Sequence, residues 1–116
     1  MDIKIDGVTY SEKNTGSFRR DTNGFAFFYD GVVRPGELML LDMPPRTSNR
    51  RGVNDIGFCY EDGITLYATL SQKPDDENAV WQKIEPNDEV NKTVNWIAAV
   101  NSKDVDKRVN INVIMF

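Results

Sequence analysis

Few side chains in this sequence are suited to chemistry. The 116 residues include no histidine and a single cysteine, Cys59. Histidine is the base of Ser-His-Asp and Cys-His pairs and the commonest metal ligand, so its absence removes these kinds of site. Cys59 lies in an expected strand without an obvious activating base, and we expect it to be a small buried side chain. The composition therefore predicts a protein that is not an enzyme and holds no cofactor.

Three consecutive acids, Asp75, Asp76 and Glu77, raise the question of a calcium site. Calcium binds several carboxylate and carbonyl oxygens at once. Consecutive side chains point in different directions, however, and the segment has no glycine to supply the sharp turn of an EF-hand loop. We expect an exposed turn, with Asp75 or Asp76 capping a helical turn toward Trp81, and no metal.

Arginine is concentrated in two polar stretches. Residues 11–24 contain Arg19 and Arg20, and residues 43–55 contain Arg46, Arg50 and Arg51. Guanidinium groups bind carboxylates and phosphates through paired hydrogen bonds. The net charge of −4 disfavours broad binding to nucleic acid. We therefore predict that these arginines contact a protein partner, which includes other copies of the chain; an ordinary solvated loop is the alternative.

Aromatic side chains are the other candidates for binding, as a stacking platform for sugars. Two tryptophans in so small a domain are more often core anchors whose indole N–H bonds to a carbonyl, and we favour that interpretation. Tyr67 is the best candidate for an outer face, because its neighbours Leu66 and Ala68 claim the inner one. The full aromatic set is Tyr67, Trp81, Trp96, Tyr60 and Phe27.

The elements that position these side chains are expected to be strands. No window has the apolar spacing of an amphipathic helix without Gly or Pro, whereas short alternating runs recur between turn residues. Asp6-Gly7 predicts one hairpin turn, and residues 61–63 predict another. The last strand is expected to pair centrally or to meet a neighbouring subunit. The predicted strands are residues 3–5, 8–10, 25–29, 37–41, 56–60, 64–70, 80–84, 95–100 and 108–115.

This pattern predicts one all-β domain over residues 1–116. We expect a single β-sandwich or jelly roll of about 7–9 short antiparallel strands with long polar loops. The apolar runs are too short to span a bilayer, and residues 1–7 lack the basic-then-apolar order of a secretory signal. We therefore expect no membrane partner.

The second half of the chain resembles small virion proteins of tailed phages. The resemblance covers residues 64–116 and rests on ITLYATLSQKPDDENAVWQKI, DEVNKTVNWIAAVN and RVNINVIMF. These share the layout of A-T-L-S, an acidic loop, W-x-x-I and V-N. The resemblance implies a capsid decoration (cement) protein, or a neck, tail or fibre component, in a virion assembled in the host cytoplasm.

A decoration protein would be a homo-oligomer that binds the major capsid protein or another virion protein. Its two arginine-containing loops would lie across joints between capsid subunits, where many weak contacts add up. Two other functions stay open. One is a carbohydrate-binding module that uses Tyr67 and one tryptophan, and the other is a phage-encoded inhibitor of a host protein.

Overall fold

The computed structural model describes residues 1–12, 14–20, 24–47, 51–86 and 88–116, and all of its regular elements are strands. The all-β prediction is therefore confirmed, with eleven strands within these ranges. No helix in these ranges is long and apolar enough to cross a membrane. The strands are β1 Asp2–Ile5, β2 Val8–Ser11, β3 Asn14–Ser17, β4 Arg19–Arg20, β5 Ala26–Val33, β6 Leu38–Asp42, β7 Val53–Tyr60, β8 Ile64–Thr69, β9 Trp81–Ile84, β10 Trp96–Asn101 and β11 Lys107–Met115.

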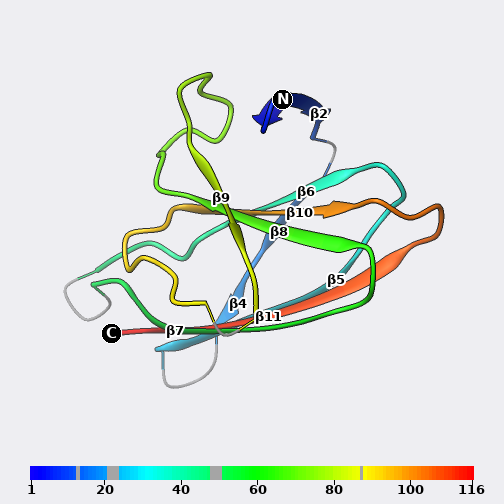
Figure 1. Ribbon diagram of the computed structural model, residues 1–116. Helices are drawn as coiled ribbons and strands as arrows, with labels where there is room; N and C mark the ends of the chain where they lie inside the picture. The colour runs from blue at the N-terminus through cyan, green and yellow to red at the C-terminus, as the bar shows by residue number, and fades with distance from the viewer. Residues whose placement is uncertain (13, 21–23, 48–50, 87) are drawn as a thin grey trace.

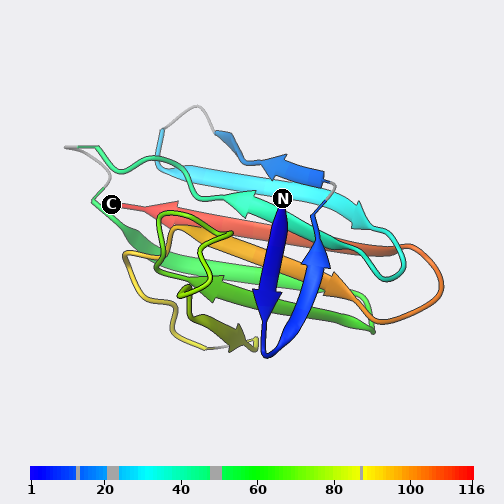
Figure 2. The ribbon, with the colours of Figure 1, turned by 90° about the horizontal axis from the view of Figure 1, so that it is seen from above.

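These strands form three sheets that lie in layers (Figure 1). A five-stranded sheet has the order β3-β6-β10-β8-β9, and a four-stranded sheet has the order β4-β5-β11-β7. The third sheet is the hairpin β1-β2, which lies on the far side of the five-stranded sheet from the four-stranded one (Figures 1 and 2). The pairs are antiparallel except for β3 with β6, which is parallel.

The main core lies between the two large sheets. The last strand, β11, has one fully buried face, which points into this core. Its apolar residues alternate with polar or exposed ones and are Val109, Ile111, Val113 and Met115. β11 pairs with β5 on one side and β7 on the other, which confirms the expected central position. Inward-facing side chains of β6, β8 and β10 complete the same cluster from the opposite sheet.

A second core cluster lies beneath the hairpin β1-β2. Ile3 and Ile5 are almost fully buried and pack with Leu40 and Ala98 on the outer face of the five-stranded sheet. The expected Asp6-Gly7 turn is confirmed, with φ values of 50° and 81° that suit a tight hairpin turn. The hairpin therefore shields apolar side chains that would otherwise face water.

The order of pairing along the chain is nested. β5 pairs with β11, β6 with β10 and β8 with β9. Each pair thus encloses the next one in the sequence, from the ends of the chain toward its middle. β7 has no such partner strand in the described part of the chain. The connection between β9 and β10 takes that place and touches β7 at its start, where the Val53 N–H donates to Lys92 O at 3.0 Å.

The predicted hairpin around residues 61–63 is wrong. β7 and β8 do follow one another through a tight turn, in which Gly63 has a φ of 99°, but they belong to different sheets. Both strands carry apolar residues at alternate positions. The two strands do not lie side by side in one sheet; their apolar faces meet across the core between the two sheets. A turn that changes sheets and a turn that closes a hairpin have the same local sequence signals.

Residues 11–24 were expected to form an irregular loop, but they contain the two strands β3 and β4. Both strands lie at sheet edges, and their residues are mostly exposed. A strand that buries little has no apolar alternation, which is why its sequence resembles a polar loop.

Candidate partner-binding surfaces

Arg19 and Arg20 form the short edge strand β4 beside β5. Both side chains are exposed, and their Cα partners are Phe28 and Phe27. Within the described ranges neither arginine forms an ion pair. Arg51 is likewise exposed and unpaired there, although its backbone N–H donates to Phe116 O at 2.9 Å. These three guanidinium groups are therefore presented to solvent.

Arg46 has a different role from the one that the sequence predicts. Its guanidinium donates two hydrogen bonds to Asn95 Oδ1, at 3.1 and 3.0 Å, and one to Thr93 O at 2.8 Å. These bonds tie the chain after β6 to the chain before β10. Most of the donors of Arg46 are thus used inside the protein. Arg50 lies outside the described residues.

Tyr67 lies on the outer face of the five-stranded sheet, as predicted from its position in β8. Its ring is half-buried, because it packs at the margin of the cluster beneath the β1-β2 hairpin. Tyr10 of that hairpin is close by: burial raises the pKa of Tyr10, and Tyr67 and Asp6 add to the shift. Tyr67 therefore shares its face with the hairpin instead of standing on an open platform.

The two tryptophans occupy the same outer face, and each meets only part of the prediction of a buried, hydrogen-bonded anchor. Trp96 is half-buried and its Nε1–H donates to Gln72 O at 3.1 Å. Trp81 is 8% exposed, and among the described residues its Nε1 has no hydrogen-bond partner. The remaining members of the aromatic set, Phe27 and Tyr60, belong to the other core, between the two large sheets. The five rings are thus divided between two sites.

The acidic segment 75–77 is a hydrogen-bonded turn. Asp76 Oδ1 accepts the Asn78 N–H at 2.9 Å, and Asp76 O accepts the Ala79 N–H at 3.0 Å. Capping by Asp76 is therefore present, but in a turn of the local Asx type and not in a helix. Over the described ranges, no three acidic or sulfur-bearing side chains cluster closely enough to hold a metal ion.

Cys59 is exposed, and the expectation that it is buried is wrong. In β7 the residues that face the core are Ile56, Phe58 and Tyr60, so Gly57 and Cys59 face outward. The sequence GFCY has no polar residue to indicate the outward face, and a strand of this composition has two possible registers.

A groove that the sequence did not indicate runs along the free side of β7. Its volume is about 1040 Å³, and six consecutive β7 residues form one wall, while Gln82 of β9, Pro86 and residues 88–92 form the rest. A second cavity of about 750 Å³ adjoins this groove and shares five lining residues with it: Gln82, Asp88, Glu89, Val90 and Asn91. The only available signal was the long polar connection after Ile84, in which few residues are apolar.

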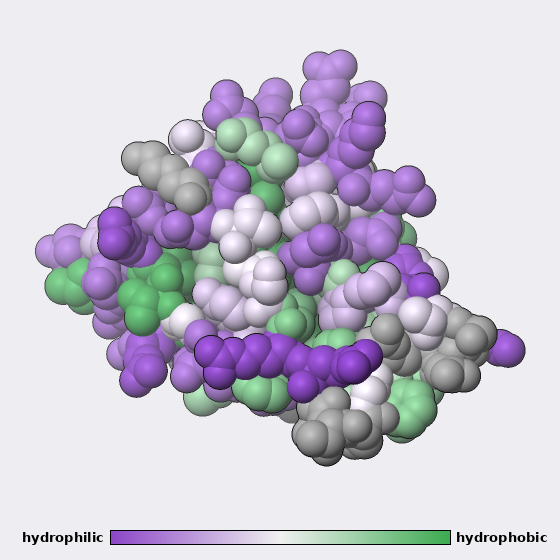
Figure 3. Space-filling view, turned by 180° about the vertical axis from the view of Figure 1, so that it is seen from behind, coloured by the Kyte–Doolittle hydropathy of each residue, from purple (hydrophilic) through white to green (hydrophobic). Residues whose placement is uncertain are grey.

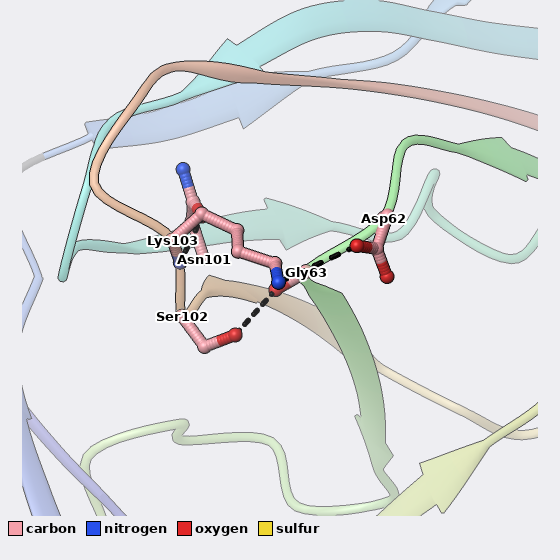
Figure 4. A network of polar contacts seen from close by, with 5 residues as sticks. All are labelled: Asp62, Gly63, Asn101, Ser102 and Lys103. Atoms are coloured by element: carbon pink, nitrogen blue, oxygen red, sulfur yellow. Dashed lines mark hydrogen bonds and ion pairs between the residues drawn. The ribbon is translucent and has the colours of Figure 1, made fainter.

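A network of polar contacts holds the opposite end of the core together (Figure 4). Asn101 is 1% exposed and its side chain bonds three backbone groups. Beside it, the N–H and the Oγ of Ser102 both donate to Gly63 O, and Lys103 forms an ion pair with Asp62 at 3.4 Å. This corner joins the turn before β8 to the end of β10.

Comparison of the chain with protein-family models, with curated proteins and with solved structures gives no match.

Proposed function

We propose that this protein is a non-enzymatic structural protein with a jelly-roll fold, and that it binds the surface of a virion as a decoration protein. The observation that carries the proposal is the nested pairing of β5 with β11, β6 with β10 and β8 with β9 across two facing sheets. A jelly roll is built in this way from eight strands, and it is a common fold of capsid and lectin domains.

The eighth strand of this jelly roll is replaced by the connection between β9 and β10. This connection follows β9 in the chain and meets β7 through the Val53–Lys92 bond, which is where the nested pattern requires a strand. Because one fold serves many functions, the virion role rests on the surface as well.

The exposed surface favours binding through charged groups. The face seen in Figure 3 is largely hydrophilic, and its hydrophobic residues form small separate patches. Three arginines are exposed and form no ion pair among the described residues: Arg19, Arg20 and Arg51. Their guanidinium groups are therefore available to acidic groups of a partner. A decoration protein would use such contacts in many copies at once.

Co-sedimentation with purified capsids from the same source tests the proposal. We expect the wild-type protein to sediment with capsids at physiological salt, and the double variant Arg19→Glu/Arg20→Glu to lose binding. The control is Lys4→Glu/Lys73→Glu, which changes the net charge equally at exposed positions elsewhere. Absence of wild-type binding, or equal loss in both variants, would contradict the proposal.

A carbohydrate-binding function is the second candidate, because lectin domains share the jelly roll and Tyr67 and Trp96 are half-exposed on one sheet face. Glycan binding that is abolished by Tyr67→Ala would favour it. Tryptophan fluorescence that no glycan alters would contradict it.

A further inference from the structure

One edge of β7 pairs with no other strand among the described residues. The Glu61 N–H donates to Arg108 O, so the backbone there faces β11. In an antiparallel ladder successive residues face opposite edges, so Ile56, Phe58 and Tyr60 direct their N–H and C=O groups away from β11. The Ile56 N–H agrees with this, since it bonds Asp55 Oδ1 at 2.9 Å. Within the described ranges, no backbone group bonds this edge beyond Val53.

The groove beside this edge has an apolar floor. Ile56 and Phe58 point into the core but are only half-buried, because no strand of the described ranges covers them on this side. Val90 of the segment opposite is also half-buried and lines the same groove. An extended chain laid along β7 could therefore hydrogen-bond the edge and bury every second side chain against these three residues.

The groove is acidic. Among the lining residues that the structure describes, Asp55, Asp88 and Glu89 are exposed carboxylates, and Lys92 is the single base. None of the three acids takes part in an ion pair with another described residue. A partner segment with basic side chains would complement this charge. Two copies joined edge to edge through a two-fold axis would instead bring like-charged acids together.

We propose that β7 accepts an extended segment of a partner protein as an added strand, and that this segment alternates basic with apolar residues. The apolar side chains cover Ile56, Phe58 and Val90, while the basic ones meet Asp55, Asp88 and Glu89. The added strand lies in the groove against the edge of β7, between β7 and the connection that runs from β9 to β10. This inference goes beyond the virion role, because it does not depend on which protein supplies the segment.

The test uses a panel of eight-residue peptides in which Lys alternates with Val, Ile, Leu or Phe. Binding to the full chain is measured by fluorescence anisotropy, and amide hydrogen exchange is followed by NMR. We expect members of the panel to bind and to slow exchange at Phe58 and Tyr60 by about tenfold or more, whereas the Ile56 N–H is already bonded to Asp55 Oδ1. Peptides with Glu in place of Lys, or with methylated backbone amides on the side facing β7, should bind about tenfold more weakly or worse.

Protein variants distinguish binding in the groove from attraction of the basic peptides to the net negative charge of the protein. Asp88→Lys/Glu89→Lys should weaken peptide binding by about tenfold or more, whereas Asp75→Lys/Glu77→Lys makes the same charge change outside the groove and should have little effect.

Three results would overturn the proposal: no panel member binds below about 1 mM, binding leaves exchange at the β7 edge unchanged, or both variants weaken binding equally. Protection of these amides by self-association, seen as a dimer in sedimentation, would make a second copy the occupant and would also overturn it. A chain that binds peptides but not capsids would contradict the virion role alone.

Discussion

The side chain of Asn101 is expected to contribute more to stability than any exposed polar group near it. Its Nδ2 donates to Val33 O at 2.9 Å and to Val105 O at 2.8 Å, and its Oδ1 accepts the Lys103 N–H at 2.9 Å. One buried amide thus connects the end of β5, the turn after β10 and its own strand. Leucine or alanine at this position would leave these backbone groups without their partner.

The size of the effect follows from the three bonds. A hydrogen bond contributes about 1 kcal/mol net, and a buried group left without a partner costs about that much again or more. We therefore expect Asn101→Ala to lower the free energy of unfolding by about 3 kcal/mol. Single domains are stable by only about 5–15 kcal/mol, so this loss is a large share of the total.

Urea unfolding followed by tryptophan fluorescence measures the loss, with the slope against urea expected to stay unchanged. The matched control is Ser102→Ala. Ser102 Oγ is exposed and donates to Gly63 O at 3.2 Å, but that oxygen keeps the bond from the Ser102 N–H at 3.0 Å (Figure 4). We expect the control to cost less than about 0.5 kcal/mol. A loss below about 1 kcal/mol in Asn101→Ala, or equal losses in both variants, would refute the reasoning.

Three further predictions concern other parts of the fold. Burial raises the pKa of Asp42, so folding disfavours its ionised form relative to the unfolded chain. Asp42→Asn should therefore raise the urea midpoint slightly at pH 7. This gain should vanish as the pH falls below the carboxyl pKa of the unfolded chain, where the carboxyl is protonated in both states. A Cβ at Gly31 would clash with the ring of Tyr29, whereas one at Gly57 would meet no atom within 4 Å, so Gly31→Ala should lower the thermal midpoint far more than Gly57→Ala. Ile3 of the hairpin is 0% exposed and faces the five-stranded sheet, so Ile3→Asn should detach the hairpin from that sheet and shift the tryptophan emission to the red. The exposed-site variant Lys4→Asn in the same strand should not.

The strands themselves were largely predictable from local sequence. β1 and β11 follow period-two patterns, β6 and β10 are short apolar runs between turn or polar residues, and Asp6-Gly7 closes its hairpin as expected. The inward face of β11 was predictable because, over residues 108–115, its polar residues occupy only the other face. Patterns of this kind depend on neighbours within a few residues, which is why one sequence suffices to find them.

The candidate site was predictable only in part. The position of Tyr67 on an outer face followed from alternation, but its shared contact with the β1-β2 hairpin did not, since the hairpin is far away in the chain. Arg46 resembled its neighbours in sequence, yet three hydrogen bonds to residues 93 and 95 distinguish it from them. Such bonds join segments whose approach no local pattern encodes.

Composition and periodicity determined that this chain is all-β, where most of its strands lie, and that histidine-dependent chemistry is absent. Tertiary structure decided which strands share a sheet, which face of β7 carries Cys59, and that one edge of β7 has no partner strand among the described residues and borders an acidic groove. The physical reason is that alternation specifies two faces for each strand, whereas the choice of neighbours depends on burying all of the apolar faces together.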